Sequence, residues 1–242
     1  MMLCIDCGNT RLKWGLREQG SWQATGHLQL DEASRLADVL GELVPQRVVA
    51  CNVAGSSVRE AVERSLQRQP EWVSARDQQC GVTNRYETPV QLGADRWAAL
   101  IGARAVHPGP CIVICAGTAT TIDVLDGDGV FQGGLILPGL DMMHAALASR
   151  TAQLESVIGN CVDLPRNTRD AITSGTIHAT LGAIEHMFRH VAGQPLAICL
   201  LSGGAADRIE SAMTLKWRRI EHLVLEGLAC IAETTPADSN LR

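Results

Sequence analysis

The sequence predicts an α/β protein with two lobes, residues 1–109 and 110–242, and a ligand-binding cleft between them. The order strand, Gly/Thr-rich turn, strand, strand, helix occurs twice, starting near residues 2 and 111. Pro108-Gly109-Pro110 separates the two copies, because proline ends a preceding helix. The copies share little sequence, so the repeat is one of architecture. Ligand sites favour interfaces between such lobes.

The first half begins with three strand-like runs separated by tight turns, which predict strands at 2–7, 11–17 and 21–30. Asp31 is a typical helix N-cap, and the apolar spacing after it predicts a helix to about residue 44, ended by Pro45. The remaining elements are expected in this order: a strand at 47–53, a helix from 56 or 57 to 69, a strand at 72–75, a polar irregular stretch over 77–94, and a helix at 94–107.

The second half repeats the pattern. Strands are expected at 111–116, 120–125 and 130–137, the last two joined by the hairpin turn Asp126-Gly127-Asp128-Gly129. Helices at 139–150 and 168–192, a strand at 197–201, and helices at 205–213 and 222–233 complete the chain.

Composition excludes several classes of protein. With 46% apolar and 19% charged residues among 242, the chain is typical of a folded globular protein. A net charge of −5 and only 3% aromatic residues argue against nucleic-acid or anionic-membrane binding. The sequence has neither a membrane-spanning apolar run nor a signal peptide. Nine cysteines, an odd number lying mostly in apolar runs, indicate reduced thiols in a cytoplasmic protein.

No metal site is expected from the close cysteine and histidine pairs. Cys4/Cys7 and Cys111/Cys115 lack a further ligand at zinc-site spacing, and buried free cysteines behave as small apolar residues. His186 and His190, one helical turn apart, have no evident third ligand either.

The first turn carries groups suited to a nucleotide triphosphate. Asp6 ends a strand predicted to be buried, and a carboxylate there is costly unless it holds a cation or meets donors. Gly8, Asn9, Thr10 and Lys13 follow, and they offer backbone N–H, amide, hydroxyl and ammonium donors for phosphate oxygens, with Mg²⁺ near Asp6. The alternative is a plain hairpin turn with a surface lysine.

The second turn repeats this chemistry. Gly117-Thr118-Ala119-Thr120-Thr121, followed by Asp123, places three hydroxyls beside an accessible backbone. These residues suit phosphate binding, although threonines also simply favour strands. Gly203-Gly204, after a later strand, offers a third backbone for close approach, suitable for a nucleoside.

A third candidate lies where the helix at 94–107 begins. Asp95 suits the helix dipole in the first turn, whereas Arg96 does not, so an anionic ligand explains Arg96 better than helix stability does. The adjacent Asp95 carboxylate is placed to accept a proton from a hydroxyl group. The alternative is a helix cap with an exposed arginine.

These motifs together resemble the type III pantothenate kinase family. The segments DCGNTRLKW, LGADRW, GTATTID, GGLILPG and NTRDAI occur in that order, and the resemblance extends from Asp6 to residues 223–229. It implies the acetate and sugar kinase/Hsp70/actin fold, with two ribonuclease H-like lobes and ATP in the cleft. It also implies phosphorylation of pantothenate toward coenzyme A, with Mg²⁺ and a monovalent cation (K⁺ or NH₄⁺), in a homodimer.

The resemblance also implies roles for individual residues, which fall into ATP-binding, catalytic, substrate-binding and cation-binding groups. ATP phosphates would meet Asp6, Gly8, Asn9, Thr10, Lys13, Gly117, Thr118, Thr120 and Thr121. Asp95 would be the catalytic base, with Tyr86, Gly93, Arg96 and, across the dimer interface, Thr168 at pantothenate; Asp6 would bind Mg²⁺ and Asp123 the monovalent cation. Cys115 departs from the family, because many relatives have Asp at that position.

Two alternatives remain at this stage. The chain is compatible with another hydroxyl kinase or phosphatase of the same superfamily, and with a non-catalytic accessory factor that acts on transcription. Asp6, Lys13, Asp95 and Arg96 are all present, which favours the kinase, because a decayed site loses such groups.

Overall fold

The computed structural model describes residues 1–150 and 158–234, which form two compact units. The first comprises Met1–Pro108 together with His222–Arg242, and the second is Gly109–Glu221. The sequence-based division instead assigns 1–109 to the first lobe and everything after residue 109 to the second. The last helix differs from it: α7 (Leu223–Thr234) packs against α3 (Ala94–Val106) in the first unit rather than within 110–221.

The first unit contains a five-stranded sheet with β1 at its centre. Its strands are β1 (Met2–Cys7), β2 (Arg11–Glu18), β3 (Ser21–Gln29), β4 (Arg47–Asn52) and β5 (Glu71–Trp72), in the order β3-β2-β1-β4-β5. The β1–β2 and β2–β3 pairs are antiparallel, as tight turns require, whereas β4 lies parallel to both β1 and β5. These strands confirm the order of elements that the sequence predicts.

Strand alternation gives this sheet two different covers. Leu3, Ile5 and Cys7 pack with Leu36 and Val62 from the helices α1 (Leu36–Leu40) and α2 (Ser56–Leu66). Cys4, Val49 and Cys51 point to the other face, where they pack with apolar residues of α3 and α7. Asp6 therefore belongs to the face that α3 and α7 cover.

The connecting segments of this unit depart from expectation in two places. Residues 30–44 form a 3₁₀ helix (Leu30–Arg35) and the short α1 instead of one long helix, because Gly41 adopts a φ of 60° and ends α1 early. The stretch 77–94 is more regular than predicted. It forms the hairpin β6 (Gln78–Gln79) and β7 (Val82–Asn84), whose turn residues Cys80 and Gly81 have φ of 50° and 74°, followed by a 3₁₀ turn (Pro89–Gln91).

The second unit repeats the strand order of the first. Its strands are β8 (Cys111–Ala116), β9 (Ala119–Leu125), β10 (Val130–Pro138), β11 (Ile198–Ser202) and β12 (Trp217–Arg219), in the order β10-β9-β8-β11-β12. The first three are antiparallel, and β11 and β12 are parallel additions. The predicted repeat of architecture is confirmed, although β12 is a strand that the sequence analysis does not predict.

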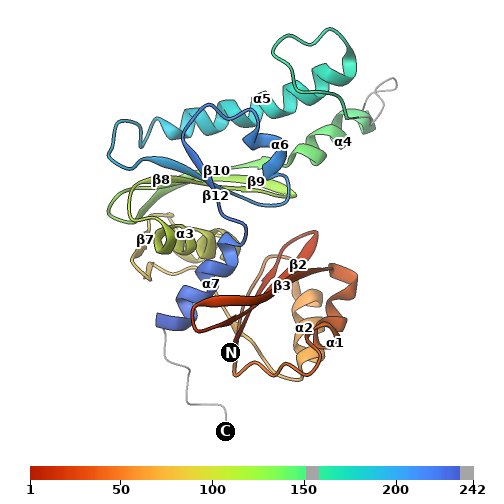
Figure 1. Cartoon of the computed structure of the whole chain (residues 1–242), viewed down its shortest axis with the longest axis vertical. Helices are drawn as coiled ribbons and strands as arrows, with labels where there is room; N and C mark the ends of the chain where they lie inside the picture. The colour runs from red at the N-terminus through yellow and green to blue at the C-terminus, as the bar shows by residue number, and fades with distance from the viewer. Residues whose placement is uncertain (151–157, 235–242) are drawn as a thin grey trace. The chain divides into compact units, whose positions relative to one another are not determined.

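Helices α4 (Leu140–Arg150), α5 (Thr168–Phe188) and α6 (Ala206–Glu210) lie together on one face of this sheet (Figure 1). Ile112 and Ile114 of β8, Ile122 of β9 and Leu201 of β11 form the core beneath them. Among the helices of the described ranges, none combines the length and apolar character needed to cross a bilayer.

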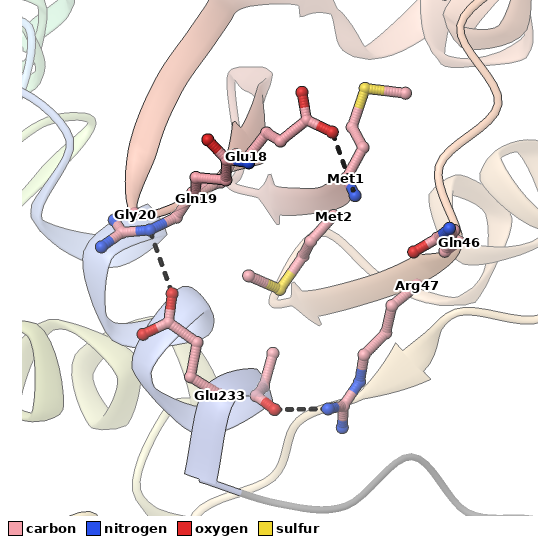
Figure 2. A pocket seen from close by; sticks show the side chains of 10 residues that line it. Met1, Met2, Glu18, Gln19, Gly20, Gln46, Arg47 and Glu233 are labelled. Carbon is pink, nitrogen blue, oxygen red and sulfur yellow. Dashed lines mark hydrogen bonds and ion pairs between the residues drawn. The ribbon is translucent and has the colours of Figure 1, made fainter.

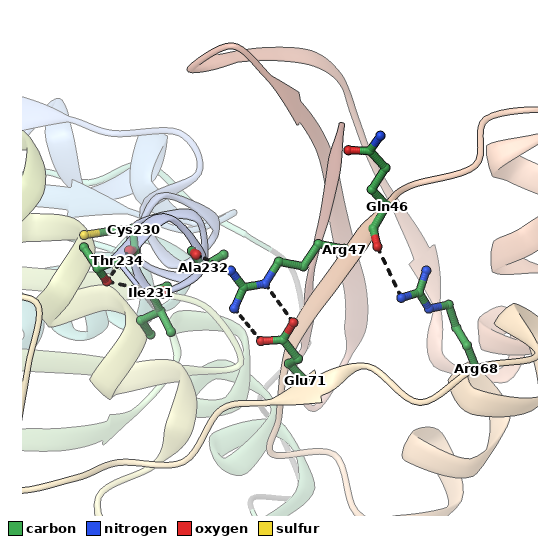
Figure 3. Close-up of polar contacts among 8 residues, drawn as sticks. All are labelled: Gln46, Arg47, Arg68, Glu71, Cys230, Ile231, Ala232 and Thr234. Carbon is green, nitrogen blue, oxygen red and sulfur yellow. Dashed lines mark hydrogen bonds and ion pairs between the residues drawn. The ribbon is translucent and has the colours of Figure 1, made fainter. Parts of the chain in front are cut away.

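Polar contacts add to the apolar packing that holds α7 in the first unit. Arg47 of β4 binds the Glu71 carboxylate with both arms of its guanidinium, at 2.7 and 2.6 Å, and also donates to the backbone oxygen of Ala232 (Figure 3). Glu226 of α7 accepts hydrogen bonds from Arg17 at 2.7 Å and from the Trp22 indole at 2.6 Å. Both interactions connect α7 to strands made early in the chain.

The α3–α7 contact requires glycine. A Cβ at Gly227 would overlap the Ala98 carbonyl oxygen, and one at Gly102 would overlap the Leu223 carbonyl oxygen, so the two backbones touch. We predict that Gly227→Ala lowers the free energy of unfolding in urea by about 3 kcal/mol.

Gly182→Ala on α5 is the matched control, because a Cβ there meets open space in the middle of a helix. It is expected to raise stability by up to ~1 kcal/mol. Equal stability changes in the two variants would contradict the close-contact interpretation.

Candidate functional site

Two of the predicted residues of the first unit, Asp6 and Lys13, lie side by side in register where β1 ends. Asp6 is only 5% exposed, and its neighbours across the sheet are Lys13 on β2 and Cys51 on β4. The Lys13 ammonium lies 3.8 Å from Asp6 Oδ2, and the Cys51 thiol donates to Asp6 Oδ1 at 3.5 Å. The two oxygens of this carboxylate therefore face different groups.

On balance, the surroundings of Asp6 disfavour the charged form of its side chain. Burial raises the pKa of Asp6, the nearby Asp95 carboxylate raises that pKa further, and Lys13 and the Cys51 thiol lower it. The same surroundings raise the pKa of Cys51 well above its usual value, mainly through burial and then through Asp6 and Asp95. Asp6, Cys51 and Asp95 thus form one electrostatic group.

Asp95 lies in the first turn of α3, and the local backbone fixes its orientation. Asp95 Oδ1 accepts a hydrogen bond from the Arg96 N–H at 2.8 Å. A Cβ at Gly93 would lie 2.7 Å from the same oxygen, so a side chain at the helix cap would displace the carboxylate from this position. Gly93, Asp95 and Arg96 lie together at the start of α3.

Arg96 is buried rather than exposed, which rules out the alternative of a helix cap with a solvated arginine. Its side chain is 5% exposed, and the guanidinium lies 5.7 Å from the centre of the Tyr86 ring. Arg96 Nη1 also donates to the Tyr86 hydroxyl at 3.3 Å. The Asn84 side chain supports the Tyr86 loop by accepting from the Tyr86 N–H at 3.0 Å. The chain's single tyrosine and Arg96 therefore form one unit.

The turn after β1 leaves its polar groups accessible. The Gly8 N–H donates to the Arg11 carbonyl at 3.2 Å and closes the turn, and Asn9 and Thr10 are exposed at its tip. The turn is a plain hairpin in its backbone, as the alternative interpretation had it, but Lys13 points to Asp6 instead of standing alone on the surface.

In the second unit, three glycine-containing turns lie against one another. The Gly117 N–H donates to Ala119 O at 3.0 Å, and the Gly139 N–H donates to Thr118 O at 2.9 Å. A Cβ at Gly139 would overlap the carbonyls of Gly117 and Thr118, and one at Gly203 would overlap the carbonyl of Ala116. The turns after β8, β10 and β11 can be this close only because these positions lack side chains.

Strand alternation separates the predicted threonines of this unit. Thr120 is on the face that α4, α5 and α6 cover, and its hydroxyl is buried without a hydrogen-bond partner in the described structure. Thr121 and the 1% exposed Asp123 are on the opposite face, where Cys115 pairs with Thr121 in register. Gly117 and Thr118 are exposed in the turn itself.

Ser202 is a candidate that the sequence analysis missed. It ends β11 opposite Cys115 in the parallel pair and is 6% exposed. Alternation places Ser202 on the same face as Cys115 and Thr121. Its position directly before Gly203-Gly204 is the signal that would have found it.

Thr168 starts α5 and borders a separate hollow. Asn167 caps the helix by accepting from the Asp170 N–H at 3.0 Å, while Asp170 accepts from the Asn160 N–H at 2.8 Å. The hollow is lined by residues 158–160 and 167–170. Thr168 is exposed there, within the unit that also carries Thr121 and Asp123.

Another cavity in the first unit, shown in Figure 2, contains none of the predicted residues. Its two arginines are already paired: Arg17 binds Glu226 and Glu233, and Arg47 binds Glu71. Met1 and Met2 form part of its wall (Figure 2). Because its positive charges are neutralised, this cavity does not suit an anionic substrate.

Comparison with known proteins adds two kinds of similarity. The type III pantothenate kinase family profile matches residues 2–190. A type III pantothenate kinase of Aromatoleum aromaticum is 50% identical over 98% of this chain and 100% of its own length, and one of Dechloromonas aromatica is 42% identical over 96% and 99%.

The solved structures show likeness of fold. A Baf family transcriptional activator of Campylobacter jejuni has a TM-score of 0.65 at 20% identity and covers 96% of this chain and 97% of its own. The activator of 2-hydroxyisocaproyl-CoA dehydratase from Clostridium difficile, solved with bound ADPNP, has a TM-score of 0.55 at 14% identity over 96% and 92%. These confirm the predicted two-lobed α/β fold.

The burial of Asp6 leads to a prediction about stability. In EDTA at pH 7.5, Asp6→Asn should have a higher melting temperature than the wild-type chain, because the wild-type fold holds a buried charge near Asp95. The folded-state pKa of Asp6 is raised, so the folded protein takes up this proton first as pH falls. The difference should therefore shrink as pH decreases through that pKa toward the ordinary range of aspartate.

Asp128→Asn, at an exposed turn position, is the control and should leave the melting temperature unchanged at each pH. A lower melting temperature for Asp6→Asn at pH 7.5 would show that the Lys13 contact outweighs burial.

Proposed function

This chain belongs to the type III pantothenate kinase family, and we propose that it transfers the γ-phosphoryl group of ATP to the primary hydroxyl of pantothenate with Asp95 as general base. The family's reaction begins coenzyme A biosynthesis. The observation that supports this proposal most directly is the grouping of Asp6, Lys13 and Asp95 at the end of β1. Asp6 is a buried carboxylate whose pKa is raised further by Asp95, and acidic groups perturbed in this way cluster at functional sites.

Asp95 is placed for proton transfer. Its Oδ1 is held by the Arg96 N–H, which leaves Oδ2 to accept the proton of the substrate hydroxyl as the phosphoryl group is transferred. Arg96, stacked on Tyr86, supplies a buried positive charge for the pantothenate carboxylate, and the backbone at Gly93 allows close approach. These residues orient the acceptor and position the base.

Asp6 fits a magnesium role. Mg²⁺ is bound through one or two carboxylates, waters and substrate phosphates, and a buried carboxylate whose pKa is raised gains from a nearby cation. Within the described residues no group of three or more acidic, histidine or cysteine side chains forms an all-protein metal site, in keeping with that mode of binding. A bound Mg²⁺ would neutralise negative charge on the phosphates of ATP. Lys13, Gly8, Asn9 and Thr10 offer further donors to the phosphates.

The second unit supplies the remaining groups in this proposal. The Gly117 turn offers its backbone, Thr118 and Thr121 to the phosphates, whereas the Thr120 hydroxyl lies on the opposite face of the strand. Asp123 holds a monovalent cation, K⁺ or NH₄⁺, with Cys115 in place of a family aspartate. Thr168 reaches the pantothenate of a partner subunit in a homodimer. A cytoplasmic location accords with nine free cysteines.

The primary test is ADP release from ATP and Mg²⁺, with and without pantothenate. We expect turnover that depends on pantothenate and falls when Na⁺ replaces K⁺ or NH₄⁺. Turnover with other hydroxyl substrates alone would favour a different kinase of the superfamily. A folded protein without any ATP turnover would favour the accessory-factor alternative, and Cys115→Asp would then test whether the missing carboxylate is the cause.

The role of Asp95 is tested by Asp95→Asn. We predict a decrease in kcat of about 10²–10⁴, because the amide keeps the shape of the side chain but cannot accept the proton. Circular dichroism should show an unchanged fold. Asp128→Asn is the control for a remote loss of charge, and turnover near the wild-type value in Asp95→Asn would rule out the assigned role.

A further inference from the structure

Cys51 contacts the proposed Mg²⁺ ligand directly, although in the sequence it is only one of several cysteines in apolar runs. It is completely buried in β4, opposite Asp6 in the parallel β1–β4 pair. Its thiol donates to Asp6 Oδ1 at 3.5 Å, within the range of a sulfur hydrogen bond. This contact comes from register alone, since 45 residues separate the two positions.

The geometry gives the two oxygens of Asp6 separate partners. Oδ2 faces the half-exposed Lys13 ammonium at 3.8 Å, which is a long and flexible contact. Oδ1 faces Cys51, whose backbone is fixed in the sheet and whose side chain is packed among Cys4, Val49 and Leu228. Of these two contacts, only the one from Cys51 comes from a fully buried side chain.

We propose that Cys51 is a positioning residue, whose S–H group holds Asp6 Oδ1 so that the carboxylate presents Oδ2 toward Mg²⁺ and the phosphates. This inference rests on the proposed role of Asp6. A carboxylate free to rotate must be ordered when the cation binds, whereas one already held has lost less freedom. Hydrogen bonds to the ligands of a metal typically change its affinity by about 10–100-fold.

The thiol suits this position for a second reason. The surrounding side chains are apolar, and a cysteine packs among them as a small apolar residue while still carrying one donor. Alanine would also be a small apolar side chain at this position, but it would leave Asp6 Oδ1 without this donor. Serine would keep a donor, because its hydroxyl replaces the thiol, although the Cβ–O bond is shorter than the Cβ–S bond.

The test uses Mn²⁺ as the probe, measured by electron paramagnetic resonance of the free ion in the presence of ADP. Cys51→Ala should bind Mn²⁺ about tenfold more weakly than the wild-type chain, and Cys51→Ser should stay within about threefold of it. Cys4→Ala is the matched control. It removes the same atom from the same apolar cluster, two residues from Asp6, and should leave Mn²⁺ affinity unchanged.

Steady-state kinetics gives a second measurement. We expect Cys51→Ala to raise the KM for Mg·ATP about tenfold with the KM for pantothenate unchanged, and Cys51→Ser to restore it. A loss of packing alone would affect Cys51→Ala and Cys4→Ala alike. Equal effects of these two, equal weakening by alanine and serine at Cys51, or wild-type Mn²⁺ affinity in Cys51→Ala would each overturn the proposal.

A measurement on the folded wild-type chain covers the case in which Cys51→Ala does not fold. The infrared S–H stretching band that disappears in Cys51→Ser should lie at lower frequency than the band that disappears in Cys4→Ala, because donation to a carboxylate weakens the S–H bond. Equal frequencies would overturn the proposal.

The Mn²⁺ measurement also separates this proposal from the proposed function. If the wild-type chain binds no Mn²⁺ with ADP, the proposed Mg²⁺ role of Asp6 fails as well. If the wild-type chain binds Mn²⁺ and Cys51→Ala binds it equally well, only the role of Cys51 fails.

Discussion

The candidate site of the first unit depends on one constraint. A charged carboxylate that is buried at the end of a central strand must be stabilised by the side chains next to it. β1 lies between β2 and β4, so Asp6 has Lys13 on one side and Cys51 on the other. Lys13 comes from the strand that directly follows this turn, whereas Cys51 comes from β4, 45 residues from Asp6. The sheet must be complete before the carboxylate has both contacts, and the fold and the site therefore form together.

The sheet of the second unit has the same strand order as that of the first, but it carries fewer charged groups at the corresponding positions. β8 takes the central position of β1, and its equivalent polar face carries Cys115, Thr121 and Ser202, with Asp123 one strand away from β8. Positive charge and two carboxylates are thus concentrated in the first unit. The second presents mainly backbone and hydroxyl groups around three closely packed glycine turns. The repeated architecture does not imply repeated chemistry.

Sequence patterns predicted the strands and the two repeated halves well, because alternation and turn residues are local signals. They failed where a single backbone angle decides, as at Gly41, and where a strand is short, exposed and charged, as β12 is. Asp6, Asp95 and Arg96 were found because charge at the end of a strand or helix is unusual. Cys51 and Ser202 were missed, since their significance comes from register across the sheet, which no local pattern encodes. The same alternation divides Thr120 from Thr121.

The discontinuous first unit has a consequence for synthesis on the ribosome. Its sheet is made first, but α7, which covers the same sheet face as Asp6, is the last described element to emerge. Residues 109–221 are translated in between, which takes on the order of ten seconds at about 5–20 residues per second. Until α7 has been made, Cys4, Val49 and Cys51 lack the apolar cover that this helix provides in the folded chain. The nascent chain therefore exposes part of an apolar sheet face until the last described helix has been synthesised.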